Sequence, residues 1–185
     1  QSKRRMLIKR LAQKKPTLFN KYSNAWINMK KMSKYLRNSQ QFNLTAQGTI
    51  NTYAVFAEKN LSLLSNNGYF GIVSPTAIIM NYFMQDFFRC IEKNQYIHSL
   101  FDFINERKIF DIVSGFRFSL LTLSKKEKGL DDNLIPMAFY LKMPIEVQKL
   151  LSEINQKPLK KLKENRLLQK LILFEPSDFR LFNPN

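Results

Sequence analysis

Residues 51–75 constrain the fold more than any other stretch, because they place a helix, a glycine turn and a short apolar strand in direct succession. Asn51-Thr52 predicts a capped helix start. Glu58 and Lys59 are expected to face water, and the apolar helix positions are Tyr53, Val55, Phe56, Leu61, Leu63 and Leu64. Asn66-Asn67-Gly68 predicts a left-handed turn, and residues 69–74 predict a buried strand closed by Pro75. Helix, turn and strand form half of the repeating unit of a parallel α/β sheet.

The rest of the chain predicts helices before this unit and strands after it. Helices are expected over residues 2–14, 17–38 and 81–93, and over 145–173 in two pieces broken at Pro158. Strands are expected over residues 96–103, 116–123 and 137–141, with a loop over 104–115. An apolar stripe on the second helix is expected to pack, and it comprises Leu18, Tyr22, Trp26, Met29 and Met32. The order predicts a doubly wound sheet that switches to antiparallel pairing at its edge.

Positive charge is concentrated at the start of the chain. The sequence has 30 Lys and Arg against 14 Asp and Glu, a net charge of +16. Residues 1–40 hold twelve cations and no acid, residues 41–124 are balanced, and residues 125–185 add +4. This distribution favours a polyanionic partner such as nucleic acid. Solvation of a lysine-rich helix surface and contact with an anionic membrane remain open, although no apolar run is long enough to span a bilayer.

Few residues of this chain suit metal or nucleophilic chemistry. Cys90 and His98 are the single cysteine and the single histidine, so neither an internal disulfide nor an ordinary zinc site is expected. A Cys90–His98 nucleophilic pair is formally possible, but a buried cysteine and a strand histidine are the favoured interpretation. Asp102 and Asp111 do not make a convincing acid-base pair. The lone cysteine predicts a reducing, cytoplasmic location.

Several segments together resemble a known family. Residues 48–58 carry Asn51, Tyr53, Phe56 and Glu58, and a Gly turn then leads to the strand ending Val73-Ser74-Pro75-Thr76. Further similar segments are Phe101-Asp102-Phe103, Ile109-Phe110, residues 116–123, Phe139-Tyr140-Leu141 and residues 176–185. In this order they resemble the amino-methyltransferases of type IIG restriction-modification enzymes and related phage-defence methylases. Residues 4–42 are similar to the helical insert that follows the catalytic tetrapeptide of such enzymes.

The resemblance implies methyl transfer from S-adenosylmethionine to the exocyclic amine of adenine in DNA, with the base flipped out of the helix. An Asn-Pro-Pro-aromatic loop and a Gly-rich loop perform this chemistry in the family, and neither motif occurs in this sequence. No catalytic and no metal-binding residue is therefore expected here, and the chain is expected to be inactive alone and to bind the cofactor weakly or not at all. A non-catalytic DNA-binding or protein-interaction module is the alternative.

The resemblance also implies roles for individual residues. Phe110 corresponds to an aromatic that stacks on the flipped adenine, and Asn51, Tyr53 and Pro75 correspond to the border of the cofactor pocket. Helix capping, a turn-forming proline and core packing explain these residues without any function. Expected DNA phosphate contacts are Lys3, Arg4, Arg5, Lys9, Arg10, Arg107 and Lys108.

These inferences divide the chain into three parts and set an expectation for the fold class. Residues 1–47 are expected to form a basic helical insert, 48–144 the C-terminal half of a methyltransferase sheet, and 145–185 a helical extension with the start of a further region. The fold expected is α/β, a partial class I methyltransferase (Rossmann-like) sheet with antiparallel edge strands. An unpaired apolar edge would favour an upstream methyltransferase half or a second copy as partner. The basic start, without Met and without a following apolar stretch, suggests a trimmed chain rather than a signal peptide.

Overall fold

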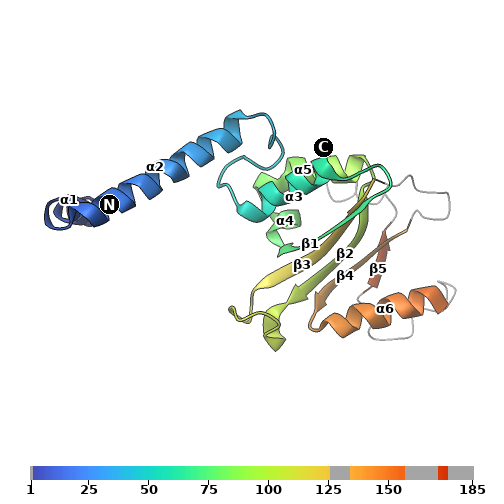
Figure 1. The fold of residues 1–185 in the computed structure, drawn as a ribbon. Helices are drawn as coiled ribbons and strands as arrows, with labels where there is room; N and C mark the ends of the chain where they lie inside the picture. Colours follow the sequence, from blue (N-terminus) through green and yellow to red (C-terminus); the bar gives the residue numbers. More distant parts are fainter. Residues whose placement is uncertain (1, 126–133, 157–170, 175–185) are drawn as a thin grey trace.

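The protein is described by a computed structural model that covers residues 2–125, 134–156 and 171–174 (Figure 1). Two long helices come first, α1 (Ser2–Lys14) and α2 (Pro16–Asn38), and α3 (Thr52–Leu63) follows a linking segment. The remaining elements are β1 (Tyr69–Pro75), α4 (Ala77–Met80), η1 (Tyr82–Met84), α5 (Gln85–Lys93), β2 (Ile97–Ile104), η2 (Asn105–Arg107), β3 (Arg117–Ser124), β4 (Ile135–Leu141), α6 (Pro144–Gln156) and β5 (Leu171–Phe174).

The described strands form one mixed sheet in the order β1-β3-β2-β4-β5. β3 lies between β1 and β2 and pairs antiparallel with both, so β1 and β2 run in the same direction. β4 pairs parallel with β2, and β5 pairs antiparallel with β4. The expectation of an α/β fold with antiparallel edge strands is confirmed, because both β1 and β5 run antiparallel to their neighbours. The arrangement is compatible with a partial Rossmann-like methyltransferase sheet.

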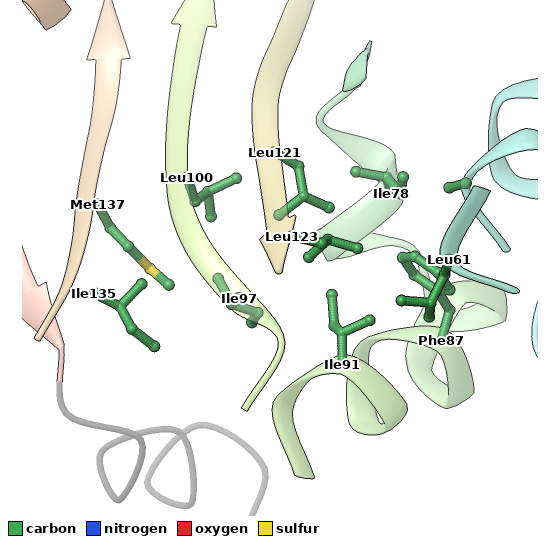
Figure 2. Packing of buried hydrophobic residues seen from close by; sticks show 11 residues of the cluster. Leu61, Ile78, Phe87, Ile91, Ile97, Leu100, Leu121, Leu123, Ile135 and Met137 are labelled. Carbon is green, nitrogen blue, oxygen red and sulfur yellow. The ribbon is translucent and has the colours of Figure 1, made fainter. Parts of the chain in front are cut away.

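Helices cover both faces of the sheet. Successive residues of a strand point to opposite faces, so each face carries apolar side chains that a helix can bury. Leu100 and Leu121 join the first apolar cluster with Leu61 of α3 and Ile78 of α4. Figure 2 shows these side chains with those of Phe87 and Ile91 from α5, at the junction of strands and helices. On the opposite face, Phe101, Phe103 and Phe118 pack with Leu141 and with Leu150 of α6.

Helix α3 and the turn after it differ in several details from their sequence-based prediction. None of residues 66–68 has a positive φ, so the predicted left-handed turn is wrong, and Phe56 and Leu63, predicted on the apolar side of the helix, are exposed. Glu58 is buried, with 8% of its surface exposed, whereas a water-facing position was expected. Its carboxylate accepts hydrogen bonds from the Thr45 hydroxyl at 2.6 Å and from the Leu44 backbone N–H at 3.1 Å, which holds the preceding segment against the helix. Asn51 stands at the N-cap, but its side chain makes no cap hydrogen bond. The linking segment thus takes the place of solvent at Glu58.

The apolar stripe on α2 was expected to pack, and this expectation is wrong within the described part of the chain. Leu18, Trp26, Met29 and Met32 are exposed, and neither α1 nor α2 contains a buried residue. Both helices extend away from the sheet as an arm (Figure 1). The spacing of apolar residues predicted an amphipathic α2 correctly, but no described element covers the apolar side of this helix.

The base of this arm is attached to the core by Arg37. Its guanidinium donates to the carbonyl oxygens of Ala46 at 2.9 Å and of Gly48 at 2.7 Å. Gly48 has a φ of 52°, and a Cβ there would lie 2.4 Å from the ring of Phe83. Glycine is therefore required where the chain turns from the arm into α3.

Two helix predictions need correction. The helix expected over residues 81–93 is divided into η1 and α5, because the Asn81 side chain accepts from the Phe83 N–H at 2.9 Å and caps a separate turn. Residues 171–173 were expected to be helical and instead begin β5. Their pairing with β4, a contact between segments distant in the sequence, overrides the local helical pattern. The expectations for the break at Pro158 and for the tail 175–185 fall outside the described residues.

Truncating Leu121 to alanine should destabilise the protein strongly, because this β3 side chain is 1% exposed at the centre of the first cluster. A buried Leu→Ala change costs about 2–5 kcal/mol through lost transfer energy and a cavity. Leu63→Ala is the matched control, since Leu63 is 70% exposed. Urea unfolding measures both, and similar losses in the two variants would contradict this description of the core.

Candidate nucleic-acid interface at the carboxyl edge of the sheet

The carboxyl ends of β1, β2 and β4 lie at the same edge of the sheet, together with the start of β3. The pairing of Pro75 with Phe118, of Ile104 with Arg117 and of Phe103 with Leu141 establishes this. In α/β sheets, ligands bind at the carboxyl ends of the strands. This edge is consequently where the sheet would present a binding site.

A buried carboxylate, that of Asp102, organises this edge. Asp102 is 0% exposed, and one of its oxygens accepts from the Thr76 hydroxyl at 2.5 Å. The other oxygen accepts from the Arg117 guanidinium at 2.5 Å and 3.2 Å, and from the Tyr140 backbone N–H at 3.3 Å. A buried charge is tolerated when it is paired and fully hydrogen-bonded, and Asp102 meets both conditions.

The network extends from Arg117 to the surface. The guanidinium of Arg117 lies 4.4 Å from the centre of the Tyr140 ring and donates to the Tyr140 hydroxyl at 3.4 Å. Tyr140 is 57% exposed and has a φ of 57°, a backbone conformation that is unusual for a residue with a side chain. The Asp102 contact to its N–H helps to hold this conformation.

Two hydroxyls in the same row of the sheet make no hydrogen bond within the described chain. Ser74 pairs with Ser119, and Ser119 pairs with Asp102, so these three side chains share one face. The Oγ atoms of Ser74 and Ser119 are buried without a partner. Buried polar atoms of this kind are commonly satisfied by an ordered water.

The loop between β2 and β3 is held by the side chain of Asn105, which is 0% exposed. Its amide group donates to the carbonyl oxygens of Phe110 at 3.0 Å, Ile112 at 3.3 Å and Val113 at 3.4 Å. Its oxygen accepts from the Phe110 N–H at 3.1 Å. A single buried side chain therefore fixes the backbone of most of this loop.

Phe110 is presented at the surface by this loop. It is 42% exposed, and its ring contacts Phe118 edge-on, with centroids 4.9 Å apart. Phe118 in turn stacks on Phe103 at 5.1 Å. The position combines a fixed backbone, a rigid aromatic support and an accessible ring, which are the requirements for stacking on a planar ligand.

The residues expected at the cofactor border lie on different elements. Asn51 stands before α3 and donates its amide to the Thr49 carbonyl oxygen at 3.2 Å. Tyr53 packs half-buried against the first apolar cluster, where burial raises the pKa of its phenol. Pro75 ends β1 opposite Phe118. Only Pro75 of this group lies at the carboxyl edge.

The expected phosphate contacts form two separate groups rather than one patch. All seven side chains are exposed: Lys3, Arg4, Arg5, Lys9, Arg10, Arg107 and Lys108. The first five lie on α1, at the end of the arm (Figure 1). The last two lie at the end of η2, two to three residues before Phe110 in the sequence. No acidic residue occurs on α1.

Cys90 and His98 do not form a nucleophilic pair. Cys90 lies on α5, where desolvation and the charge of Glu58 raise the pKa of its thiol, against the lowering effects of Asn94 and Lys125. His98 is exposed on β2 and meets the Tyr69 ring edge-on at 5.1 Å. Among the described residues, no group of three or more His, Cys, Asp or Glu side chains could hold a metal ion.

Asn105, Thr76, Arg117 and Tyr140 were not identified from the sequence as site residues. A usable signal was present, since Asp102 and Arg117 are oppositely charged residues within otherwise apolar strands. Asp111 is exposed on the loop and makes none of the hydrogen bonds of Asp102, so the two do not form an acid-base pair. Both carboxylate oxygens of Asp102 are occupied by hydrogen bonds to Thr76, Arg117 and Tyr140.

One family model matches part of the chain. Residues 24–110 match the family model described as Eco57I restriction-modification methylase. The match supports a relationship to restriction-modification methylases. It runs from α2 through β2 to Phe110, and therefore includes Asp102 and Asn105 but ends before Arg117 and Tyr140. No curated protein matches the chain. Within the described residues, no helix is long and apolar enough to cross a membrane.

Replacing Arg117 with methionine should lower the free energy of unfolding by about 3 kcal/mol, because it leaves the Asp102 carboxylate buried without its cation. The double variant Asp102→Asn/Arg117→Met removes both charges and should recover a substantial part of this loss. Chemical unfolding of the single and double variants tests this coupling. A double variant no more stable than Arg117→Met would show that the unpaired charge is not the cause.

Cys90 should be alkylated by iodoacetamide more slowly than glutathione at the same pH, because the raised pKa of its thiol leaves less thiolate. The rate should increase with pH through a midpoint above that of a free cysteine. Mass spectrometry follows the modification, and unfolding in urea serves as the control that removes the difference. A folded protein that reacts as fast as glutathione would contradict this environment.

Proposed function

We propose that this chain is part of a DNA adenine methyltransferase of the type IIG restriction-modification kind, which transfers a methyl group from S-adenosylmethionine to the adenine exocyclic amine. The observation that carries the proposal is the family match over residues 24–110. The carboxyl edge supports it, because this edge combines an exposed aromatic with flanking cations.

Phe110 is the residue proposed to contact the target base. A flipped adenine needs a flat apolar surface, and a base–aromatic stack contributes roughly 1–3 kcal/mol. The Asn105 hydrogen bonds hold the Phe110 backbone at both its N–H and its carbonyl oxygen. The ring can therefore receive a base without first being ordered, which reduces the entropy lost on binding.

The described residues do not fit S-adenosylmethionine by themselves. The Asn51 amide is engaged by Thr49, the Tyr53 ring belongs to the core, and Pro75 has no N–H to donate. The five glycines are scattered at positions 48, 68, 71, 115 and 129. When bound, this cofactor supplies the methyl group, and we assign its binding and the catalytic Asn-Pro-Pro-aromatic loop to residues outside this chain.

DNA is proposed to meet the protein at two places. Arg107 and Lys108 would hold phosphates beside the target base, and the α1 cations would contact the duplex at the end of the arm. Contacts of this kind position a duplex without reading its sequence. Two separated groups would lengthen the contact along the DNA.

The open edge of the sheet supports a requirement for a partner. Within the described strands, β1 pairs on one side only, and its Tyr69 and Val73 are exposed. An unpaired strand of this kind is a template for further strands. We infer that an upstream methyltransferase half, or alternatively a second copy, pairs there, and that residues 1–47, 48–144 and 145–185 act as insert, sheet and extension. The cytoplasmic location remains a prediction.

A non-catalytic DNA-binding or protein-interaction module is the second candidate. The exposed apolar stripe of α2 favours it, because an amphipathic basic helix is a common docking element. Methylation separates the two candidates, since an interaction module would not support methyl transfer with any added polypeptide.

The chain should shift a DNA duplex at low salt, and the complex should dissociate near roughly 0.3 M salt because several phosphate contacts release counterions. The Arg107→Ala/Lys108→Ala variant should reduce the slope of log affinity against log salt concentration by about one unit per lost contact.

Tight S-adenosylmethionine binding by this chain in calorimetry would overturn the cofactor assignment. Methylation restored by co-expression with a polypeptide carrying the Asn-Pro-Pro-aromatic loop would support the catalytic proposal, and failure with the parent protein's own upstream half would refute it.

A further inference from the structure

The tip of the β2–β3 loop exposes an unusual amount of apolar surface. Ile112 is 43% exposed, Val113 is 70% exposed and Phe116 is 37% exposed. Each follows Phe110 within six residues, so the apolar surface continues beyond the proposed base-stacking ring. None of these side chains belongs to either apolar cluster of the described residues. Their exposure therefore serves no packing role within the described chain.

Several hydrogen bonds hold the loop that carries this surface. The Asn105 amide donates to Ile112 and Val113, the Ile112 N–H donates to the Phe110 carbonyl at 2.8 Å, and the Phe116 N–H donates to the Val113 carbonyl at 3.1 Å. The Asn105 N–H closes the base of the loop on the Phe116 carbonyl at 3.0 Å. Such a loop can press its side chains against a partner without collapsing.

Charge around the tip indicates the class of partner. Glu106 is neutralised by Lys142, with an Nζ–Oε2 distance of 2.5 Å. Arg107 and Lys108 then outweigh Asp111, so the exposed loop is net positive. An apolar tip flanked by cations is the arrangement by which proteins insert a side chain between base pairs while holding the neighbouring phosphates. A purely apolar protein partner would not need these cations.

We propose that Ile112 and Val113 form an apolar wedge that enters duplex DNA beside the base received by Phe110, and that Asn105 is the positioning residue of this wedge. The proposal rests on the proposed function, because it takes DNA as the ligand of this edge. The wedge fills the space left when a base leaves the stack, which offsets part of the unstacking cost. Loop 105–116 thus combines a stacking platform with a wedge.

The test compares a fully paired duplex with the same duplex carrying one central mismatch, measured by fluorescence anisotropy on the 185-residue chain. Ile112→Ser/Val113→Ser should weaken binding to the paired duplex about tenfold, and binding to the mismatched duplex no more than about twofold, because a mismatch already lowers the unstacking cost. Leu63→Ser is the matched control, since Leu63 is also 70% exposed but lies at the end of α3.

Asn105→Asp provides a second variant, because it keeps the acceptor for the Phe110 N–H and removes the donors to three carbonyl oxygens. It should reproduce the selective loss on the paired duplex, with 2-aminopurine fluorescence at the central position reporting the reduced unstacking. Circular dichroism confirms that each variant retains its fold, and Ile112→Ser/Val113→Ser alters only exposed side chains.

The outcomes separate the wedge from the underlying function. Equal losses on both duplexes, or no loss for either variant, would overturn the wedge while leaving DNA binding intact. Failure of the unmodified chain to bind either duplex would overturn both proposals. Loss of binding to a protein partner, with DNA binding unchanged, would assign the apolar tip to a protein interface instead and reject the wedge.

Discussion

The buried ion pair between Asp102 and Arg117 is the interaction on which the carboxyl edge of the sheet depends. A charge with no exposed surface is costly unless it is paired, and here its partners come from three other strands of the sheet or from their ends. Thr76 follows β1, Arg117 begins β3 and Tyr140 lies in β4, while Asp102 itself belongs to β2. The Thr76 N–H also donates to the Arg117 carbonyl at 3.2 Å. One side chain therefore helps to fix the relative positions of four strands at the carboxyl edge of the sheet.

Two buried polar side chains stabilise different parts of this edge. Asp102 holds the strands together, and Asn105, three residues later, holds the loop that leaves them. Their sequence proximity couples the loop to the sheet, because β2 ends between them. A loop attached in this way can expose Phe110 and its apolar neighbours and still keep a single backbone conformation.

The arm formed by α1 and α2 follows a different physical principle. It has no buried residue and is attached to the core through Arg37 and the segment near Gly48. It combines concentrated positive charge with an exposed apolar stripe, whereas the sheet is stabilised by two apolar clusters of its own. The sheet is thus stabilised within the described residues, whereas the arm is attached only at its base.

The sequence by itself determined the strands near residues 69–75, 97–104 and 117–124, the α/β class and the asymmetry of charge, because alternation, turn residues and composition are local properties. It also indicated Phe110 as an aromatic in a loop. Only the tertiary structure decided that β3 lies between β1 and β2, that Glu58 is buried, and that the α2 stripe is exposed. Periodicity shows that a side of an element is apolar, but not which distant element covers it. The hydrogen-bond partners of Asp102 and Glu58 could not be predicted from the sequence for this reason, because these contacts join residues far apart in the chain.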